Sequence, residues 1–309
     1  MTVFERPEPA RPWLPRRTSA AMLLPAMLLI ATFLVLPFAW TLVISLTNSQ
    51  LLGPEAADLR WVGLANYARL LPSDGWLTRG GFGWSLWVTA QFVFGSAILG
   101  QVGLGLALAW ALYGWRGPLR EFVLSLAIMA WILPDTVVAF AWFAVLDRNA
   151  GALNAALAWL GLGRPDWQLD YALLSVIVFN AWRGAAFSML LFSAALATIP
   201  PSYLEASTVA GASGWQKFRD ILLPFLRAYI ITDVLLVMLW TLNTFTPFLL
   251  TGGGPVERTE MLSIYIYLAA FVPPFRFGQG AAISIVVLIL NLLLGLVFLA
   301  YVRRNRLRV

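Results

Sequence analysis

Long apolar stretches, separated by polar or glycine- and proline-rich connections, dominate the pattern along this chain. A helix needs roughly 20 mainly apolar residues to cross the hydrocarbon core of a bilayer. The strict alternation of apolar and polar residues that a membrane barrel strand requires is absent, so the pattern indicates helices. Six stretches are long enough: Ser19–Leu46, Trp84–Leu112, Phe122–Leu146, Tyr171–Ala197, Ala228–Leu250 and Ala281–Val302.

These stretches predict an all-α polytopic membrane protein with six transmembrane helices in one domain, residues 19–302. Short tails, 1–18 and 303–309, flank the domain, and a polar connection, 198–227, interrupts it. The first stretch is too long for the core of a signal peptide and has no small-residue cleavage pattern, so we expect a retained helix.

Composition supports a lipid environment for this chain. Hydrophobic residues make up 60% of it and charged residues only 12%, whereas a soluble domain carries roughly 25% charged residues. The net charge is +6, but the arginines lie mostly at the ends of apolar stretches, which is typical of membrane topology rather than nucleic-acid binding.

The distribution of positive charge predicts the orientation. If the N-terminus is cytoplasmic, thirteen Lys and Arg residues fall on the inner side and seven on the outer side, with Arg183 inside a span. The positive-inside rule then places both termini in the cytoplasm. We therefore expect a multi-pass protein of a bacterial-type inner membrane.

The residue inventory argues against catalysis by this chain. There are no cysteines and no histidines, which removes thiolate nucleophiles, imidazole bases and the usual zinc ligands. A nucleotide site would need a glycine-rich loop ending in Lys-Ser or Lys-Thr, and the only lysine, Lys217, has no such loop before it. We expect a subunit with no catalytic residues, no metal and no cofactor of its own.

The polar connection at 198–227 has a distinctive pattern. Its prolines end the preceding span, and Ser202 with Glu205 has the spacing of a capping box that would start a new helix. Gly211 permits a sharp turn before a second expected helix, Trp215–Leu222. The pattern alone fits either an ordinary interfacial loop or a compact projection that enters a cleft in another protein.

A family resemblance favours the second interpretation. Glu-Ala-Ala, three residues, Gly, about nine residues and Ile-x-Leu-Pro form the cytoplasmic coupling loop of binding-protein-dependent ABC importer permeases, which this connection resembles. Two positions depart from that pattern: Ser207 replaces the usual Ala, and Ala210 stands where many sugar permeases have Asp. The residues that match the pattern or stand in it are Glu205, Ala206, Ser207, Gly211, Ile221, Leu223 and Pro224.

Other segments extend the resemblance to the carbohydrate-uptake branch of that family, of maltose or glycerol-phosphate type, and to its larger-type subunit. They are Trp61–Tyr67, Leu250–Pro255, Ser263–Tyr267, Phe271 and Phe277–Ala282. The resemblance implies a type I ABC importer permease fold and a second permease subunit that completes the pathway. It also implies two ATPase subunits that bind ATP and Mg²⁺, an extracytoplasmic solute-binding protein and a sugar-like solute, with no nucleic acid involved.

The expected solute site lies within the spans. Trp240 and Asn243 are three residues apart and share one helix face, so an indole ring and an amide could act together on a sugar. Similarity to maltose-importer permeases implies solute contacts at Trp182, Gly184, Phe187, Trp240 and Asn243. Tryptophan and asparagine in membrane bundles also serve packing and interhelical hydrogen bonds, and this alternative stays open.

Two charged residues within the spans need a separate explanation. Asp135 and Arg183 are expected to form a structural ion pair, although Asp135 could bind solute hydroxyls and Arg183 could bind a phosphate if the solute is a glycerol phosphate. A secondary transporter and a membrane-embedded enzyme are rival classes for the chain. The cargo is left open among disaccharide, monosaccharide, polyol and glycerol phosphate.

Overall fold

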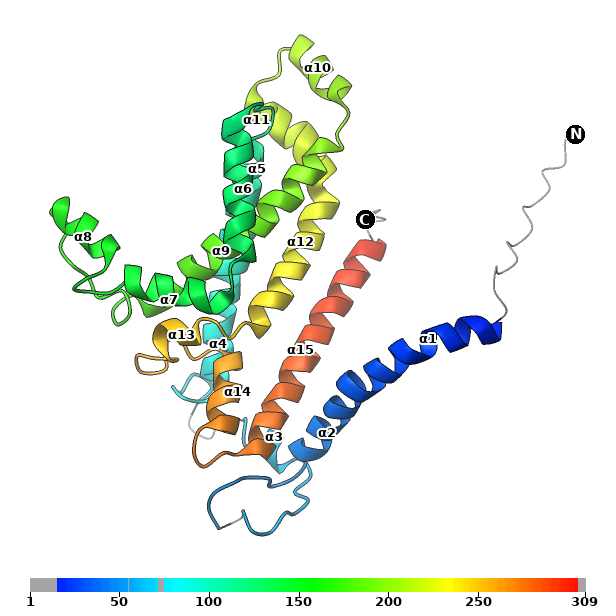
Figure 1. Ribbon diagram of the computed structural model, residues 1–309, viewed down its shortest axis with the longest axis vertical. Coiled ribbons are helices and arrows are strands. Elements are labelled where there is room, and N and C mark those ends of the chain that lie inside the picture. Colours follow the sequence, from blue (N-terminus) through cyan, green and yellow to red (C-terminus); the bar gives the residue numbers. More distant parts are fainter. Residues whose placement is uncertain (1–15, 55, 72–74, 305–309) are drawn as a thin grey trace, which may run out of the picture.

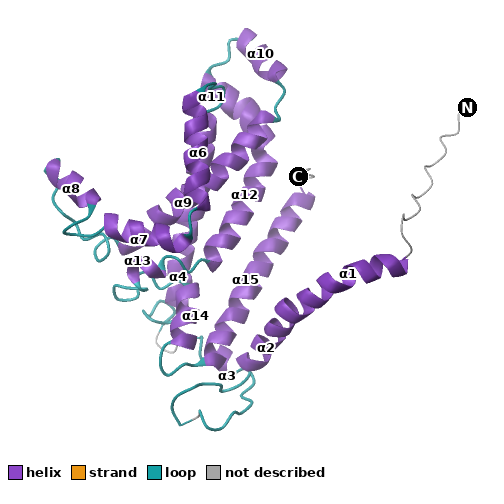
Figure 2. Ribbon diagram, in the orientation of Figure 1, coloured by secondary structure: helices purple, strands orange, loops and turns teal. Residues whose placement is uncertain are grey.

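The chain forms a bundle of long helices with shorter helices at its ends. The computed structural model describes residues 16–54, 56–71 and 75–304, and the regular secondary structure of these residues is helical. Helix α10 (Pro201–Val209) projects from one end of the bundle, and the loops around α3 (Ala65–Ala68) lie at the opposite end (Figure 1). Figure 2 shows helices and loops without a strand in the described part of the chain.

Four of the six predicted spans are confirmed as long apolar helices. The first consists of α1 (Arg16–Ile30), the π-helical turn η1 (Ala31–Val35) and α2 (Leu36–Ser45). The other three are α4 (Phe82–Phe92) continued by η2 (Val93–Leu104) and α5 (Gly105–Ala111), then α9 (Ala172–Ala197), then α15 (Phe277–Arg304). The predicted tails lie largely outside the described residues.

The third predicted span, Phe122–Leu146, is not straight. It consists of α6 (Pro118–Ile132) and α7 (Asp135–Val145), which meet at an angle of 104°. Pro134 explains the break, because its ring disfavours helical geometry at the preceding residue, and Leu133 is extended with ψ 136°. The bend carries the chain sideways out of the bundle towards α8 (Ala152–Trp159) (Figure 1).

The fifth span also differs from the prediction, which placed a separate helix at Trp215–Leu222 and a span at Ala228–Leu250. Instead α11 (Gly214–Lys217), η3 (Phe218–Leu222) and α12 (Leu223–Asn243) form one helix of 30 residues. The wider π-helical turn η3 lies just before Pro224, where it makes room for the proline ring. The helix ends at Asn243, and α13 (Phe248–Thr251) is a separate turn.

The connection after α13 is anchored to α4 by hydrogen bonds. The Trp84 indole donates to the carbonyl oxygen of Glu257 at 2.7 Å, and the Leu262 backbone amide donates to the Thr89 hydroxyl at 2.9 Å. Glu260 is buried and accepts from the Ser85 hydroxyl at 3.1 Å. Burial raises the pKa of the Glu260 carboxyl group. These contacts fix the start of α14 (Leu262–Phe271) against α4.

The centre of the bundle depends on close contact between η2–α5 and α9. A Cβ atom at Gly100 would lie 2.3 Å from Cβ of Ala181, and one at Gly105 would lie 2.4 Å from Cβ of Ser188. Lipid is as apolar as the helix surfaces, so the hydrophobic effect does not drive membrane helices together. Small residues of this kind allow the helices to approach closely and pack by van der Waals contact instead. Phe192 is fully buried in the same region.

Asp233 is an unexpected feature of the core, because its side chain is fully buried in α12 and the nearby Ser188 hydroxyl, which is the neighbouring polar group, forms no hydrogen bond of good geometry with either carboxyl oxygen. Burying a polar group without a hydrogen bond costs about 1–3 kcal/mol. We therefore expect Asp233→Leu to raise the midpoint of thermal unfolding of the detergent-solubilised protein, measured by tryptophan fluorescence. Asp233→Asn, which keeps a polar group there, is the matched control and should gain less. A lower midpoint for the leucine variant than for wild type would contradict this prediction.

Candidate functional site

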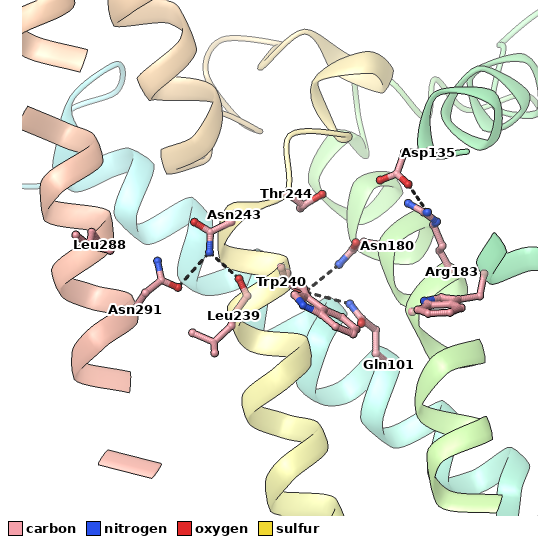
Figure 3. A pocket seen from close by; sticks show the side chains of 13 residues that line it. Gln101, Asp135, Asn180, Arg183, Leu239, Trp240, Asn243, Thr244, Leu288 and Asn291 are labelled. Atoms are coloured by element: carbon pink, nitrogen blue, oxygen red, sulfur yellow. Dashed lines mark hydrogen bonds and ion pairs between the residues drawn. The ribbon is translucent and has the colours of Figure 1, made fainter. Parts of the chain in front are cut away.

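The cavity that contains most of the predicted solute residues has a volume of about 750 Å³ and lies among η2, α6, α7, α9, α12 and α15 (Figure 3). Polar side chains from separate helices meet there, although these helices are mainly apolar. The lining residues are Gln101, Trp131, Asp135, Asn180, Arg183, Gly184, Leu239, Trp240, Thr241, Asn243, Thr244, Leu288 and Asn291. Polar groups inside a membrane bundle are costly unless they are used, so this cavity is the main candidate site.

The end of α12 supplies one wall of the cavity. The Asn243 amide donates to the carbonyl oxygen of Leu239 at 2.7 Å and to the Asn291 side-chain oxygen at 3.1 Å. This second bond joins α12 to α15, as Figure 3 shows. The Trp240 ring is 49% exposed and lines the same wall. The predicted pairing of indole and amide on one helix face is therefore present.

Hydrogen bonds connect the opposite wall to α12. The Gln101 amide donates to the Thr241 hydroxyl of α12 at 3.1 Å, and the Asn180 amide donates to the same hydroxyl at 3.4 Å and to the Ser96 hydroxyl of η2 at 2.8 Å. Gly184 faces Gln101 so closely that a Cβ atom there would lie 2.0 Å from the Gln101 side-chain oxygen. A glycine at this position therefore preserves both the bond from Gln101 and the space in the cavity.

Asp135 and Arg183 form the predicted ion pair. Asp135 also accepts from the Thr246 hydroxyl at 2.9 Å, and Arg183 donates to the carbonyl oxygen of Leu133 at 3.4 Å. The pair joins α9 to the break between α6 and α7, so it has a structural role. Both residues also line the cavity, and the Asp135 side chain is 53% exposed.

The structure brings together four of the five residues predicted to contact solute. Gly184, Trp240 and Asn243 line the cavity, and the Phe187 ring lies at its edge, 4.8 Å from Trp240 between ring centroids. Trp182 is elsewhere. Its ring packs 5.7 Å from Trp142 and faces a separate apolar cavity.

The helical repeat explains the different position of Trp182. With 3.6 residues per turn, positions 180, 183, 184 and 187 fall on one side of α9, and position 182 points away from them. The polar lining residues Gln101, Asn180, Thr241, Thr244 and Asn291 were not foreseen. The sequence does contain a signal for Gln101, Asn180 and Asn291: each is an isolated amide within a long apolar stretch, and polar residues in such stretches indicate a functional site.

A second candidate surface, at the end of the bundle, is formed by α10 and the turn after it. The predicted capping box at Ser202 and Glu205 is wrong, because α10 starts at Pro201, and Pro200 at the N-cap makes no side-chain cap. Proline suits the first helical position, where its missing N–H group costs little. The capping box lies instead at the start of α11, between Ser213 and Gln216.

The turn after α10 has the geometry predicted for it. Gly211 has φ +74°, a left-handed value that L side chains rarely adopt. The Lys217 ammonium donates to the Thr208 hydroxyl at 2.9 Å, and the Tyr203 ring packs against Phe225 at 5.3 Å. These contacts hold α10 against the helix that contains α12.

The residues predicted to couple this chain to a partner differ in exposure. Glu205, Ala206, Gly211 and Pro224 are exposed, whereas Ser207, Ile221 and Leu223 are half-buried. Glu205 borders a cavity of about 510 Å³ together with Arg116 and Arg120. Glu205 is exposed, and among the described residues it forms no ion pair.

A bundle of membrane-length helices with a polar cavity among them, and a projecting helix at one end, defines a polytopic membrane permease. Residues 101–307 match the family of binding-protein-dependent transport system inner membrane components. The match covers most of the chain, which therefore belongs to this family.

Comparison with individual proteins agrees with this assignment. The chain is 31% identical over 291 residues to the trehalose/maltose transport system permease protein MalF of Thermococcus litoralis, covering 92% of this chain and 93% of that protein. It is 28% identical to the sn-glycerol-3-phosphate transport system permease protein UgpA of Yersinia pseudotuberculosis, covering 96% and 98%. A crystal structure of a bacterial ABC transporter that imports alginate has the same fold, with a TM-score of 0.76, 22% identity and coverage of 93% and 96%.

Proposed function

We propose that this chain is one of the two permease subunits of an ABC importer and forms half of the translocation pathway for a sugar or a related polyol. The observation that carries the proposal is the cavity, where amide side chains and the exposed Trp240 ring face the same space. Amides can hydrogen-bond to hydroxyl groups, and the face of an aromatic ring can pack against the C–H face of a sugar. Relatives named for trehalose, maltose and sulfoquinovosyl glycerol transport support this class of solute.

The proposal assigns the end of the bundle with α10 to the cytoplasm, in a bacterial-type inner membrane with both termini inside. Two ATPase subunits would bind ATP and Mg²⁺ beneath it and contact α10, with Glu205 pairing with a basic group of the ATPase. A solute-binding protein would deliver the solute at the opposite end. A related alginate transporter was solved with a periplasmic protein bound to an alginate pentasaccharide, which supports this arrangement.

A glycerol phosphate is the second candidate solute. Two observations favour it: the similarity to the sn-glycerol-3-phosphate permease, and the position of Arg183 at the cavity. The ion pair argues against it, because Asp135 already offsets the positive charge that would attract a phosphate group. The sugar is therefore the better supported solute.

The decisive experiment uses the complete purified transporter with its binding protein in liposomes. The ATPase rate is measured with maltose, trehalose, an alginate oligosaccharide and sn-glycerol 3-phosphate. We expect a carbohydrate to raise the rate and to enter the liposomes. If sn-glycerol 3-phosphate is the only solute that raises the rate, a glycerol phosphate is the favoured solute. Solute uptake by this subunit without any ATPase would show a secondary transporter instead.

Asn243→Ala tests the cavity directly. Removing the amide deletes its bond to Asn291 and one hydrogen-bonding group for the solute, which is worth about 1 kcal/mol or roughly a fivefold change in uptake. We expect uptake to fall and the ranking of solutes to change, as measured with labelled sugars in liposomes. The matched control is Asn149→Ala on an exposed loop, which should behave as wild type. An unchanged solute profile for Asn243→Ala would exclude this site.

A further inference from the structure

Five aromatic rings follow one another from the segment between α12 and α13, through α13 and α14, to the start of α15. Phe245 and Phe248 are stacked with ring centroids 4.9 Å apart, and Tyr267 lies 5.1 Å from each of them. Phe271 is 5.9 Å from Tyr267, and Phe277 is 6.4 Å from Phe271. We call these residues the outer aromatic row. None of them lines the solute cavity.

The outer aromatic row begins at the rim of the cavity. Thr244, which lines the cavity, directly precedes Phe245, and the Thr246 hydroxyl donates to the cavity carboxylate of Asp135 at 2.9 Å. The Ser263 hydroxyl donates to the carbonyl oxygen of Thr244 at 2.7 Å, which fixes α14 to the same rim. From there α14 leads towards the end of the bundle opposite α10 (Figure 1). The row therefore connects the cavity with the end of the bundle at which solute would enter.

Two rings of the outer aromatic row are not fully packed: Phe245, in the segment between α12 and α13, and Phe271, at the end of α14. Phe245 is 37% exposed and Phe271 is 59% exposed, although burying an aromatic ring is strongly favourable. At the cavity there is a second aromatic group: Trp131 and Trp240 line the cavity, and Phe187 at its edge lies 4.8 Å from Trp240 and 5.5 Å from Trp131. Aromatic surface is thus available at both the entrance and the interior.

We propose that the outer aromatic row is a binding surface for the C–H faces of sugar rings, which guides solute from the outer end of the permease into the cavity. An aromatic ring has a negative face, and the axial C–H groups of a pyranose present a weakly positive apolar face to it. Rings spaced 4.9–6.4 Å apart let a solute move from one ring to the next without losing all of its contacts. This inference rests on the proposed carbohydrate function, and it predicts that solutes built of several sugar rings benefit most.

The test uses the complete transporter with its binding protein in liposomes and the probes maltose, trehalose and an alginate oligosaccharide. Phe245 and Phe271 are each replaced by Leu, which keeps apolar bulk but removes the ring, and by Trp, which keeps a ring. The amount of assembled complex is measured for every variant by size-exclusion chromatography. We expect each leucine variant to lower initial uptake at subsaturating solute by about 3- to 10-fold. The tryptophan variants should keep uptake within about twofold of wild type.

The other outcomes separate the two proposals. If the wild-type transporter imports none of the three carbohydrates, the proposed function fails and the outer aromatic row fails with it. If carbohydrate is imported but the leucine and tryptophan variants transport equally, or if leucine variants fail only because the complex does not assemble, these rings serve packing and the inference about them alone is overturned.

Discussion

Replacing Gly211 by Val is expected to lower solute import at least about tenfold while the permease still folds. Gly211 has φ +74°, which costs an L residue about 1–3 kcal/mol, and a β-branched residue tolerates it worst. A Cβ atom at this position would meet nothing within 4 Å, so the change acts through backbone direction rather than through a clash. The turn after α10 would adopt another shape, and α10 would no longer present Glu205 to the ATPase. Uptake and ATPase activity of the reconstituted complex are the measurements.

The matched control for this change is Gly211→Asn, since asparagine adopts left-handed backbone angles at lower cost. The asparagine variant should keep most of the import activity, and the valine variant should lose at least about tenfold, through loss of the ATPase subunits or through ATP hydrolysis without transport. Glu205→Lys, which reverses the charge on the exposed face of α10, should have the same effect. Wild-type uptake by the Gly211→Val and Glu205→Lys variants would refute the coupling role of this segment.

The corrected course of the fifth span supports the proposed coupling between α10 and the cavity. The sequence suggested a separate helix in the connection, but α11, η3 and α12 form one rod from Gly214 to Asn243. Its first turn is tied to α10 through Lys217, and its last turn carries Trp240 and Asn243. A displacement of α10 by the ATPase would therefore reach the cavity without an intervening joint. This is the kind of rigid-body movement by which switching proteins transmit a local change.

Hydrophobic length made most of the fold predictable. The need to cross a bilayer sets the length of a span, so four spans could be located from the apolar stretches alone. Prolines were harder to interpret. Pro134 breaks a span, whereas Pro25 lies inside α1 and Pro224 follows a π-helical turn within a continuous helix, and no local pattern announces which prolines break the helix.

The spacing of residues along one helix predicted one wall of the site, and the opposite charges of Asp135 and Arg183 predicted their ion pair. Trp240 and Asn243 share a face of α12, so their spacing was sufficient. The contributions of Gln101 and Asn291 depend on which helices pack together, and that information is not in the spacing of residues along one helix. Resemblance placed Trp182 in the site, whereas the periodicity of α9 turns its ring to the opposite side.

Asp135→Asn is the second change with a large expected effect, because it leaves Arg183 inside the bundle without its carboxylate partner. The Arg183 side chain is only 19% exposed, and removing one partner of a fully buried pair costs about 3–5 kcal/mol. Since Asp135 itself is half-exposed, we expect a smaller loss of about 1–3 kcal/mol. Thermal unfolding and the yield of folded protein are the measurements.

The double variant Asp135→Asn with Arg183→Gln separates the structural role of the pair from binding. Neutralising both partners removes the unpaired charge, so stability should return most of the way to that of wild type. If the pair is purely structural, import by the double variant recovers together with stability. If Asp135 or Arg183 also binds solute, stability recovers and import does not, because the cavity has lost the only carboxylate and the only guanidinium among its lining residues. A double variant as unstable as Asp135→Asn alone would show that the two residues do not depend on each other.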